Sequence, residues 1–496
     1  MDIVDNNTNI TKYVNINIKR HTSSSNNTAC FIKLDTEYIN KENKPIINKY
    51  KKILNQKDTN TLIKCIKHDI NIVPITHQLN DDNIHSLINE AFKHLNVYMI
   101  KFINKHVKID HGFVIELVPI FCRDGIINMI KCLHQIIKLT TEDFRSSSVM
   151  SFQFIDDKDL QPINNEACRQ ACKNGHINVV KYLHKKIGLT IQDFQSDNNY
   201  AFRWACLGNN IEVVKYLHKE IKLTTQDFQS HDNFACSWAC RHGHISIIKY
   251  LHQEIKLSKQ NFQSNHNISC HWACICGNLN IVKYLHREIK LTIQDFQEND
   301  NYACVFTCEN GHFDVVKYLH KEIGLTLQDF QSDNNSACRC ACRNGHLDIV
   351  KYLHKDIGLT IQDFQSNDNY ACRWACSSGR LDVIKYLHKD IGLTKQDFQS
   401  QNNIVCAESC QNGHLDVVKY LHKEIKLTTR DFQFKNNRAC IWACYYGHID
   451  VVKYLHKEIG LTMQDFQSNN NEAYEYTRLN GHVDVVKYLH DEFGFI

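Results

Sequence analysis

The stretch Gly345-His346-Leu347-Asp348-Ile349-Val350-Lys351-Tyr352-Leu353-His354 decides the fold of this chain, because its last four residues recur at a constant distance. Lys-Tyr-Leu-His occurs ten times, and successive copies follow one another with a period of 34. The ten copies begin at Lys181, Lys215, Lys249, Lys283, Lys317, Lys351, Lys385, Lys419, Lys453 and Lys487. A constant period of this length is typical of one supersecondary unit that is copied along the chain and buries its apolar face on its neighbours. We therefore predict a repeat protein and not a set of independent globular domains.

Each regular unit contains two helical patterns that are separated by a turn. In the first pattern, Cys168, Ala171 and Cys172 recur at the spacing of one helix face, and Gly175 follows them. The equivalent turn residue is Gly in the other units and, once, Asn209. Gly and Asn tolerate a positive φ, so we predict a left-handed residue between the two helices.

The second helical pattern ends at Gly188 or its equivalents, which are Gly in six units and Lys in four. For Gly we expect a left-handed cap, and for Lys a favourable charge at the negative end of the helix. The connector that follows has Thr190 and Asp193 in a capping-box pattern and Phe194 as an apolar anchor. We predict a short helical turn there. The Asn-rich stretch 197–199 should then form a turn and the N-cap of the next helix.

The sequence changes character along the chain. Residues 1–60 are rich in Asn, Lys, Ser and Thr with little periodicity, so we expect a weakly structured N-terminal segment. Residues 61–145 contain degenerate copies of the unit, such as Met129-Ile130-Lys131-Cys132-Leu133-His134. Residues 146–162 lengthen one connector and are predicted to be an insertion loop. Residues 163–496 hold the ten regular units.

The composition argues against several classes of protein. Lys and Arg number 58 against 54 Asp and Glu, so the net charge of +4 gives no support for a nucleic-acid or membrane partner. No apolar run approaches the roughly 20 residues that a membrane span needs. The first residues, Met-Asp-Ile-Val-Asp-Asn-Asn, lack the basic and apolar regions of a secretory signal. We expect a soluble intracellular protein, in the cytoplasm or the nucleus of the cell that contains it.

Sixteen of the 23 cysteines form eight i,i+4 pairs inside the units. Six units complete the pattern Cys-x3-Cys-x3-His, as in Cys168, Cys172 and His176, which are ligand types that zinc uses. However, a glycine separates the second Cys from the His, and other units have Phe202 for a Cys or Asn278 for the His. We interpret the cysteines as reduced core thiols and predict no metal and no cofactor. A metal- or redox-responsive cysteine-rich repeat protein is the alternative.

The segment 345–353 resembles the second helix of an ankyrin repeat, whose pattern is Gly-His-hydrophobic-acidic-Val-Val-Lys-x-Leu. Upstream, residues 337–342 occupy the place of the family's Thr-Pro-Leu-His-x-Ala-Ala helix. On that alignment Cys338 stands for the buried Leu, and Ala341 and Cys342 stand for the two small alanines. The resemblance covers about residues 163–496, with a weaker match back to about residue 80. The Asn/Ile/Lys-rich style and the Lys-Tyr-Leu-His signature are similar to ankyrin-repeat proteins of giant amoeba viruses.

The chain also departs from the ankyrin pattern. The Thr-Pro and Asp-Gly of the family's β-hairpin are absent, and the period is 34 and not 33. A tetratricopeptide array has the same period, but its Trp-x-x-Leu-Gly-x-x-Tyr pattern is missing. The predicted fold is therefore an all-α, ankyrin-like α-solenoid of helix-turn-helix units, with short helical connectors instead of regular β-hairpins.

The repeated histidines do not indicate an enzyme. His184, His218 and their equivalents recur at one phase of the second helix, which predicts a polar contact between units. Catalysis needs one distinct site, whereas these positions are equal in every unit. The sequence has no phosphate loop, Ser elbow or paired-carboxylate motif. We predict a protein without enzymatic activity.

One position of the first helix, five residues before the turn residue, differs from unit to unit. It holds Gln170, Trp204, Trp238, Trp272, Phe306, Cys340, Trp374, Glu408, Trp442 and Tyr476. The resemblance places this position on the inner helix, facing a concave groove, and aromatic anchors concentrate binding energy at interfaces. The alternative is that the rings cover neighbouring units as half-buried packing. Arginines stand next to this position in four units and could stack on the rings or contact an acidic partner: Arg169, Arg203, Arg339 and Arg373.

These observations predict an interaction scaffold that binds a partner protein through its concave face and finger tips. The predicted binding residues are Trp204, Trp238, Trp272, Phe306, Trp374, Trp442, Arg203 and Arg373. A second alternative is a substrate-recruiting adaptor that docks through its N-terminal segment. A basic and aromatic groove would also suit single-stranded nucleic acid, but the interspersed acidic residues argue against that partner.

Overall fold

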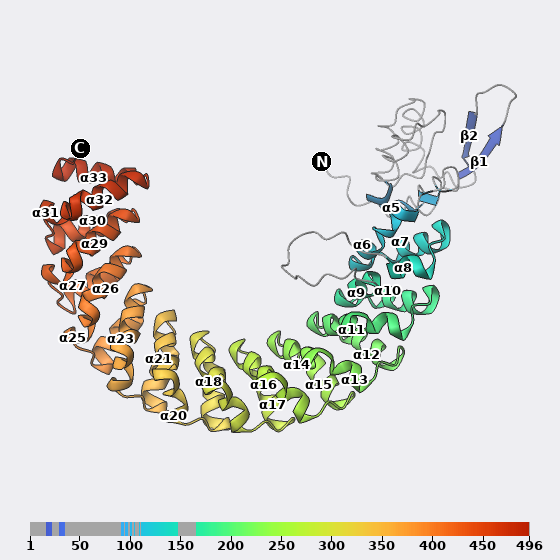
Figure 1. Ribbon diagram of the computed structural model, residues 1–496, viewed down its shortest axis with the longest axis horizontal. Coiled ribbons are helices and arrows are strands. Elements are labelled where there is room, and N and C mark those ends of the chain that lie inside the picture. The colour runs from blue at the N-terminus through green and yellow to red at the C-terminus, as the bar shows by residue number, and fades with distance from the viewer. Residues whose placement is uncertain are drawn as a thin grey trace, which may run out of the picture. The chain divides into compact units, whose positions relative to one another are not determined.

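The computed structural model describes residues 16–21, 29–34, 91–93, 95–97, 100, 101, 104, 109, 111–146 and 165–495 (Figure 1). The chain divides into two compact units, residues 1–224 and 225–496. Most of the predicted N-terminal segment and nearly all of the predicted insertion lie outside the described residues. Within the N-terminal segment, two strands pair antiparallel, with Ile16 opposite Leu34 and His21 opposite Ala29. These strands are β1 (Ile16–His21) and β2 (Ala29–Leu34).

The helices of the first compact unit succeed one another with the predicted alternation. They are α5 (His111–Ile115), α6 (Val118–Arg123), α7 (Ile127–Cys132), η2 (Leu133–Ile137), α8 (Thr141–Ser146), α9 (Glu166–Lys173), α10 (Ile177–Tyr182), η3 (Leu183–Ile187), α11 (Ile191–Leu207) and α12 (Ile211–Lys219). The elements labelled η are single π-helical turns at the ends of second helices.

The second compact unit continues the same succession. Its first part has α13 (Thr225–Phe228), α14 (Ser230–Arg241), α15 (Ile245–Gln253), α16 (Lys259–Ile275), α17 (Leu279–Arg287), α18 (Ile293–Glu309), α19 (Phe313–Tyr318), η4 (Leu319–Ile323), α20 (Leu327–Phe330), α21 (Ser332–Asn344), α22 (Leu347–Tyr352) and η5 (Leu353–Ile357). Its second part has α23 (Ile361–Ser377), α24 (Leu381–Tyr386), η6 (Leu387–Ile391), α25 (Lys395–Phe398), α26 (Ser400–Gln411), α27 (Leu415–Lys423), α28 (Thr429–Phe432), α29 (Phe434–Tyr445), α30 (Ile449–Tyr454), η7 (Leu455–Ile459), α31 (Met463–Phe466), α32 (Ser468–Leu479) and α33 (Val483–Phe493).

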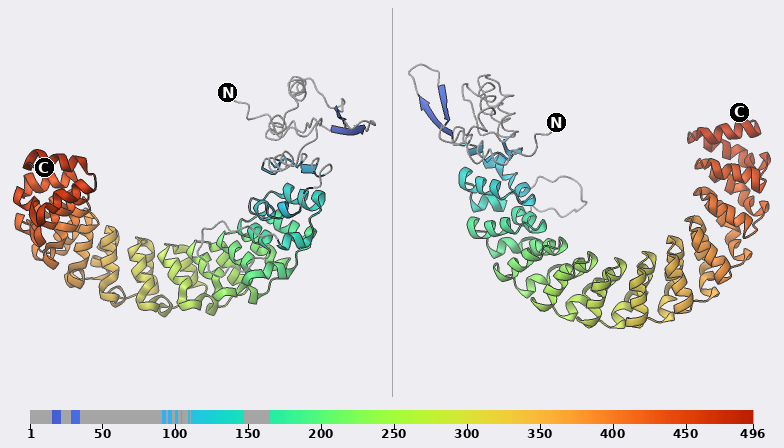
Figure 2. Two further views of the ribbon diagram at one scale, coloured as in Figure 1. Left: turned by 45° about the horizontal axis from the view of Figure 1, so that its top comes forward. Right: turned by 180° about the vertical axis from the view of Figure 1, so that it is seen from behind.

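The helices of the second compact unit form two layers. First helices pack on first helices in chain order, from α14 and α16 to α29 and α32, and second helices pack on second helices, from α15 and α17 to α30 and α33. Figure 2 shows the same succession from two further directions. The prediction of an all-α solenoid with helical connectors is confirmed, because short helical turns and not hairpins join its units.

The core consists of the residues that repeat most faithfully. In one unit, Cys338 and Ala341 of α21, Val350 and Leu353 of the second helix and Phe364 of the next connector are all fully buried. Their equivalents in other units are buried as well. Small residues on the first helix allow neighbouring first helices to approach closely, while Phe fills the space under each connector. The paired cysteines are therefore part of the packed core, as predicted.

The capping box predicted in the connectors is present. The carboxylate of Asp193 accepts hydrogen bonds from the backbone N–H of Thr190, at 2.7 Å, and from its hydroxyl, at 3.0 Å. Side chains also link successive connectors, since the amide of Gln297 donates to Asp329 at 2.8 Å. Each capping carboxylate thus joins a local helix start to the neighbouring unit.

The Asn-rich stretch is a turn, but it does not cap the next helix as predicted. Asp333, Asn334 and Asn335 have φ values of 49°, 52° and 61°, so three successive residues are left-handed. An N-cap residue normally has extended backbone geometry, which lets its side chain reach the helix N–H groups. Asn335 lacks that geometry, and its amide oxygen is buried without a hydrogen-bond partner in the described part of the chain.

The second helices end in one backbone conformation whichever residue is present. Gly188 has a φ of 87°, and Lys222 has a φ of 69°. From the sequence, a left-handed cap is expected where the residue is Gly, and a charge effect where it is Lys. The structure shows that Lys adopts the left-handed conformation too, because the chain must turn into the connector at this point in every unit.

Candidate functional site

The predicted aromatic residues lie on the exposed side of the first helices. Trp204 belongs to α11, and its neighbours Ala205 and Cys206 are fully buried, so helical periodicity turns the indole outward. All six predicted aromatic residues are half-buried: Trp204, Trp238, Trp272, Phe306, Trp374 and Trp442. They are therefore partly available to a ligand and partly covered by their neighbours.

Most of these rings contact another ring one helical turn earlier. The centroids of Tyr200 and Trp204 are 5.1 Å apart, and those of Tyr370 and Trp374 are 5.3 Å apart. The same i,i+4 pairing joins Phe234 to Trp238 at 5.1 Å and Tyr302 to Phe306 at 4.2 Å. Such pairs present a wide aromatic surface that loses little side-chain entropy on binding.

Each of the five tryptophans in the chain has a basic side chain over its ring. Lys173 Nζ is 4.2 Å from the centroid of Trp204, and Arg343 Cζ is 4.4 Å from that of Trp374. The remaining contacts are Arg241 with Trp238 at 4.8 Å and with Trp272 at 4.1 Å, and Arg438 with Trp442 at 5.0 Å. The exposed side of the first helices is therefore aromatic and basic together.

These basic partners are not among the binding residues predicted from the sequence. Three of these basic residues stand at one fixed spacing before the tryptophan that they cover: Lys173, Arg241 and Arg343. The spacing is three residues shorter than one period. That spacing places the cation one helical turn further along the neighbouring first helix. It is a signal that the sequence contains, and it becomes readable once first helices are known to pack side by side.

The two predicted arginines have different surroundings. Arg203 donates to the carbonyl oxygens of Asn198 and Asp197, both at 2.9 Å, and burial lowers the pKa of its guanidinium. Arg203 therefore stabilises the left-handed turn that precedes its helix. Arg373 is half-buried and lies near Glu408, where burial raises the pKa of the carboxyl and the charge of Arg373 opposes that rise.

The Cys-x3-Cys-x3-His pattern does not converge on one point. Burial raises the pKa of the Cys168 and Cys172 thiols, so they are neutral. His176 belongs to the next helix, and its Nε2 donates to the carbonyl oxygen of Arg123 in the preceding unit, at 2.7 Å. Among the described residues, no group of three or more His, Cys, Asp or Glu side chains is placed to hold a metal ion.

Units that lack this histidine keep the same contact. Asn278 donates to the carbonyl oxygen of Arg241 at 2.9 Å, and Arg380 donates to that of Arg343 at 3.2 Å. The position requires an N–H donor that satisfies the carbonyl groups at the end of the preceding first helix. The donor also packs on the turn glycine: a Cβ added at Gly379, whose φ is +70°, would lie 2.6 Å from His414 Nδ1.

The histidine of Lys-Tyr-Leu-His makes the predicted contact between units. His320 Nδ1 and the hydroxyl of Tyr352 in the next unit are 2.9 Å apart. The same bond joins His184 to Tyr216, His252 to Tyr284, His286 to Tyr318, His354 to Tyr386, His388 to Tyr420, His422 to Tyr454 and His456 to Tyr488. These histidines therefore have a structural role, because each forms a hydrogen bond that links two successive units.

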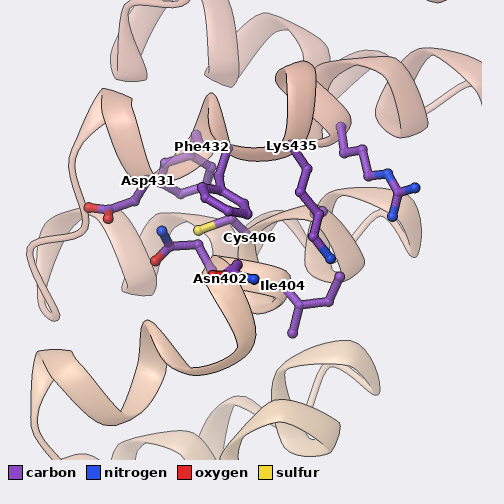
Figure 3. Close-up of a pocket in the computed structure, with 10 residues that line it drawn as sticks. Asn402, Ile404, Cys406, Asp431, Phe432 and Lys435 are labelled. Carbon is purple, nitrogen blue, oxygen red and sulfur yellow. The ribbon is translucent and has the colours of Figure 1, made fainter.

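A shallow hollow lies between α26 and α29. Figure 3 shows Lys435 and Ile404 on one side of Phe432 and Asp431 on the other. Phe434 also lines it and is 39% exposed, at a position where most units have Ser. The hollow is thus a local departure from the repeat at a finger tip.

None of the described helices has both the length and the apolar character that crossing a bilayer would require. A family model described as "Ankyrin repeats (3 copies)" matches residues 205–295, 271–363, 303–402 and 405–494. A second model, described as "Ankyrin repeats (many copies)", matches residues 168–218. A comparison with curated proteins finds no match to the chain.

Proposed function

The chain belongs to the ankyrin-repeat family, and on this basis we propose that it is a scaffold that binds a partner protein through the face of its first helices, the expected concave face, and through its finger tips. Ankyrin repeats in general mediate protein–protein interactions and are typically not enzymes. A preorganised surface of this kind binds with little change in its backbone.

One observation carries the proposal: the copies agree in their core and differ on the exposed side of the first helices. The core residues Cys338, Ala341 and Leu353 have buried equivalents in most units. The outward position of the first helices instead varies between aromatic, polar and acidic residues, and its tryptophans are half-buried with cations over their rings. Aromatic and arginine side chains are the residues that most often dominate binding energy.

An affinity purification with the full chain tests this proposal. We expect the wild-type chain to capture a defined partner, identified by mass spectrometry, and the variant Trp204→Ala/Trp238→Ala/Trp272→Ala to lose it. Loss of one hot-spot tryptophan typically weakens binding by about 2 kcal/mol, so three should abolish capture. Circular dichroism checks that the variant is folded.

The matched control replaces Lys215, Lys249 and Lys283 by Ala, because these residues lie on the second helices of the same three units. The control variant should keep the partner. The proposal would be wrong if the tryptophan variant captured every partner of the wild-type chain, or if both variants lost it equally.

We also propose an intracellular location, supported by the paired cysteines, which the array holds as buried free thiols. A viral origin stays a prediction that rests on composition and on the Lys-Tyr-Leu-His signature alone.

A further inference from the structure

Two places in the chain share one arrangement of cations and rings. In the first, Arg169 and Lys173 of α9 lie over Tyr200 and Trp204 of α11, at 4.9 and 4.2 Å. In the second, Arg339 and Arg343 of α21 lie over Tyr370 and Trp374 of α23, at 4.8 and 4.4 Å. Equivalent residues of the two arrangements are five periods apart in the sequence. One arrangement lies in each compact unit.

The two cations of each arrangement have different surroundings. Arg169 is 1% exposed and is paired with Glu166 at 3.1 Å and with Asp197 at 3.0 Å. Lys173 is half-buried, and in the described part of the chain no carboxylate lies within ion-pair distance of it. The inner cation is thus neutralised by the protein itself, whereas the outer cation lies over a ring with no carboxylate paired to it among the described residues.

The second arrangement repeats this division. Arg339 donates to Ser336 Oγ at 2.6 Å and to the carbonyl oxygen of Asp333 at 2.9 Å, so it is held in place. Arg343 is half-buried, and no described carboxylate pairs with it. A ring orients such a cation and removes part of its water shell, but it does not neutralise the charge. An acidic group would therefore gain a charge-assisted hydrogen bond there.

We propose that these two arrangements are copies of one recognition site for acidic side chains of a protein partner, with Lys173 and Arg343 as the groups that contact the carboxylate. The inference rests on the proposed scaffold function and specifies the chemistry of the partner. Each compact unit has one copy, so one chain offers two such sites.

The neighbouring charges favour single carboxylates over the continuous phosphate backbone of a nucleic acid. The side chains of Asp197 and Asp333 are 50% and 64% exposed beside the two sites. They would repel a polyanion that runs along the surface, but they leave room for one acidic side chain at each outer cation. One face of each tryptophan is already covered by a cation, which reduces the area left for base stacking.

The test is fluorescence anisotropy with the full chain and a short fluorescein-labelled peptide of alternating Glu and Ala. We expect salt-dependent binding of two peptides per chain, and no binding of the same peptide with Gln in place of Glu. Lys173→Gln and Arg343→Gln should each remove one of the two binding events, and together they should weaken binding at least tenfold.

The matched control is Lys181→Gln with Lys351→Gln. These lysines are also five periods apart, are exposed, and lie over Tyr216 and Tyr386 at 5.9 and 5.7 Å, but on second helices. The control should bind like the wild-type chain. An equal loss in the control would overturn the proposal, because binding would then reflect net charge.

Three other outcomes also overturn it: no binding of the acidic peptide, undiminished binding by the double variant, or displacement of the peptide by oligothymidylate that binds more tightly. The scaffold proposal fails separately. If the tryptophan-dependent partner is still captured by the Lys173→Gln/Arg343→Gln variant with unchanged affinity, the scaffold stands and only the acidic chemistry is wrong.

Discussion

One type of hydrogen bond, between the histidine of one unit and the tyrosine of the next, recurs through the array. Burial lowers the pKa of His286, His320 and His388, so the folded chain favours their neutral form. The hydroxyl groups that they contact belong to tyrosines that are almost fully buried. The histidines therefore couple the stability of the array to pH.

We predict that acidification destabilises the protein. Because the pKa of these histidines is lower in the folded than in the unfolded chain, the unfolded chain binds more protons as the pH falls below about 6.5. Stability is therefore fully present above that pH and is lost as the pH falls through it. Urea unfolding at about pH 7.5 and about pH 5.5 measures the change.

A variant with His286, His320 and His388 replaced by Gln is the control for this prediction. Its urea midpoint should shift less between the two pH values than that of the wild-type chain. His271 adds to the effect, because burial lowers its pKa to about 4. A midpoint that is equal at both pH values would contradict the prediction.

Among the secondary-structure elements, the connector helices begin at a residue that specific hydrogen bonds define. The helix at Ile293 begins with a capping box in which the backbone N–H of Thr292 donates to Asp295 at 2.7 Å. Gln263 of the preceding unit donates to the same carboxylate at 2.6 Å. One side chain thus starts a helix and fixes the spacing of two units.

Replacing Thr292 by Ala should lower the free energy of unfolding by about 1 kcal/mol, because the hydroxyl of the capping box is lost. Thr292→Ser keeps the hydroxyl and should cost less than half as much. Chemical denaturation of the three proteins measures both values. Equal destabilisation by Ala and Ser would mean that the methyl group and not the hydrogen bond matters.

The elements also show what the sequence allows one to predict. The two helices, the left-handed Gly175 and the capping box of Thr190 with Asp193 follow from local patterns, and all are present. Two conformations do not follow from local patterns: Lys222 is left-handed, and Asn335 does not cap the next helix. The tertiary path of the chain imposes both conformations against local preference.

The candidate site could be predicted only in part. The helical periodicity of α11 and α23 turns Trp204 and Trp374 outward, and this orientation can be predicted from the local sequence pattern. The cations over them, Lys173 and Arg343, come from the neighbouring first helix. Their spacing from the tryptophans is present in the sequence, but its meaning depends on the side-by-side packing of adjacent first helices, which the structure supplies.

At the scale of the molecule, stability should be nearly additive over units, because each unit packs mainly on its neighbours. We predict that deletion of residues 395–428, one full period, leaves a folded protein. The joined sequence Thr394-Thr429-Arg430-Asp431-Phe432 keeps the capping-box pattern. Circular dichroism should show unchanged helicity per residue, and the urea m-value should fall with the lost surface.

Deletion of residues 395–411, half a period, is the contrasting variant. It removes a first helix and leaves α27 without its partner, so we expect lower helicity and a broadened transition. Equal behaviour of the two deletions would contradict an array built from exchangeable units.

The left-handed triplet Asp333-Asn334-Asn335 has a consequence for chirality. Three successive φ values near +50° to +60° are what mirror-image amino acids adopt without strain, whereas L-residues pay roughly 1–2 kcal/mol each. In the regular units from residue 197 onward, the fold thus contains, once in each unit, a short segment that suits the opposite enantiomer. Chemical ligation of a chain with D-asparagine in such a segment would stabilise the same backbone, and a protease that requires L-residues would no longer cleave there.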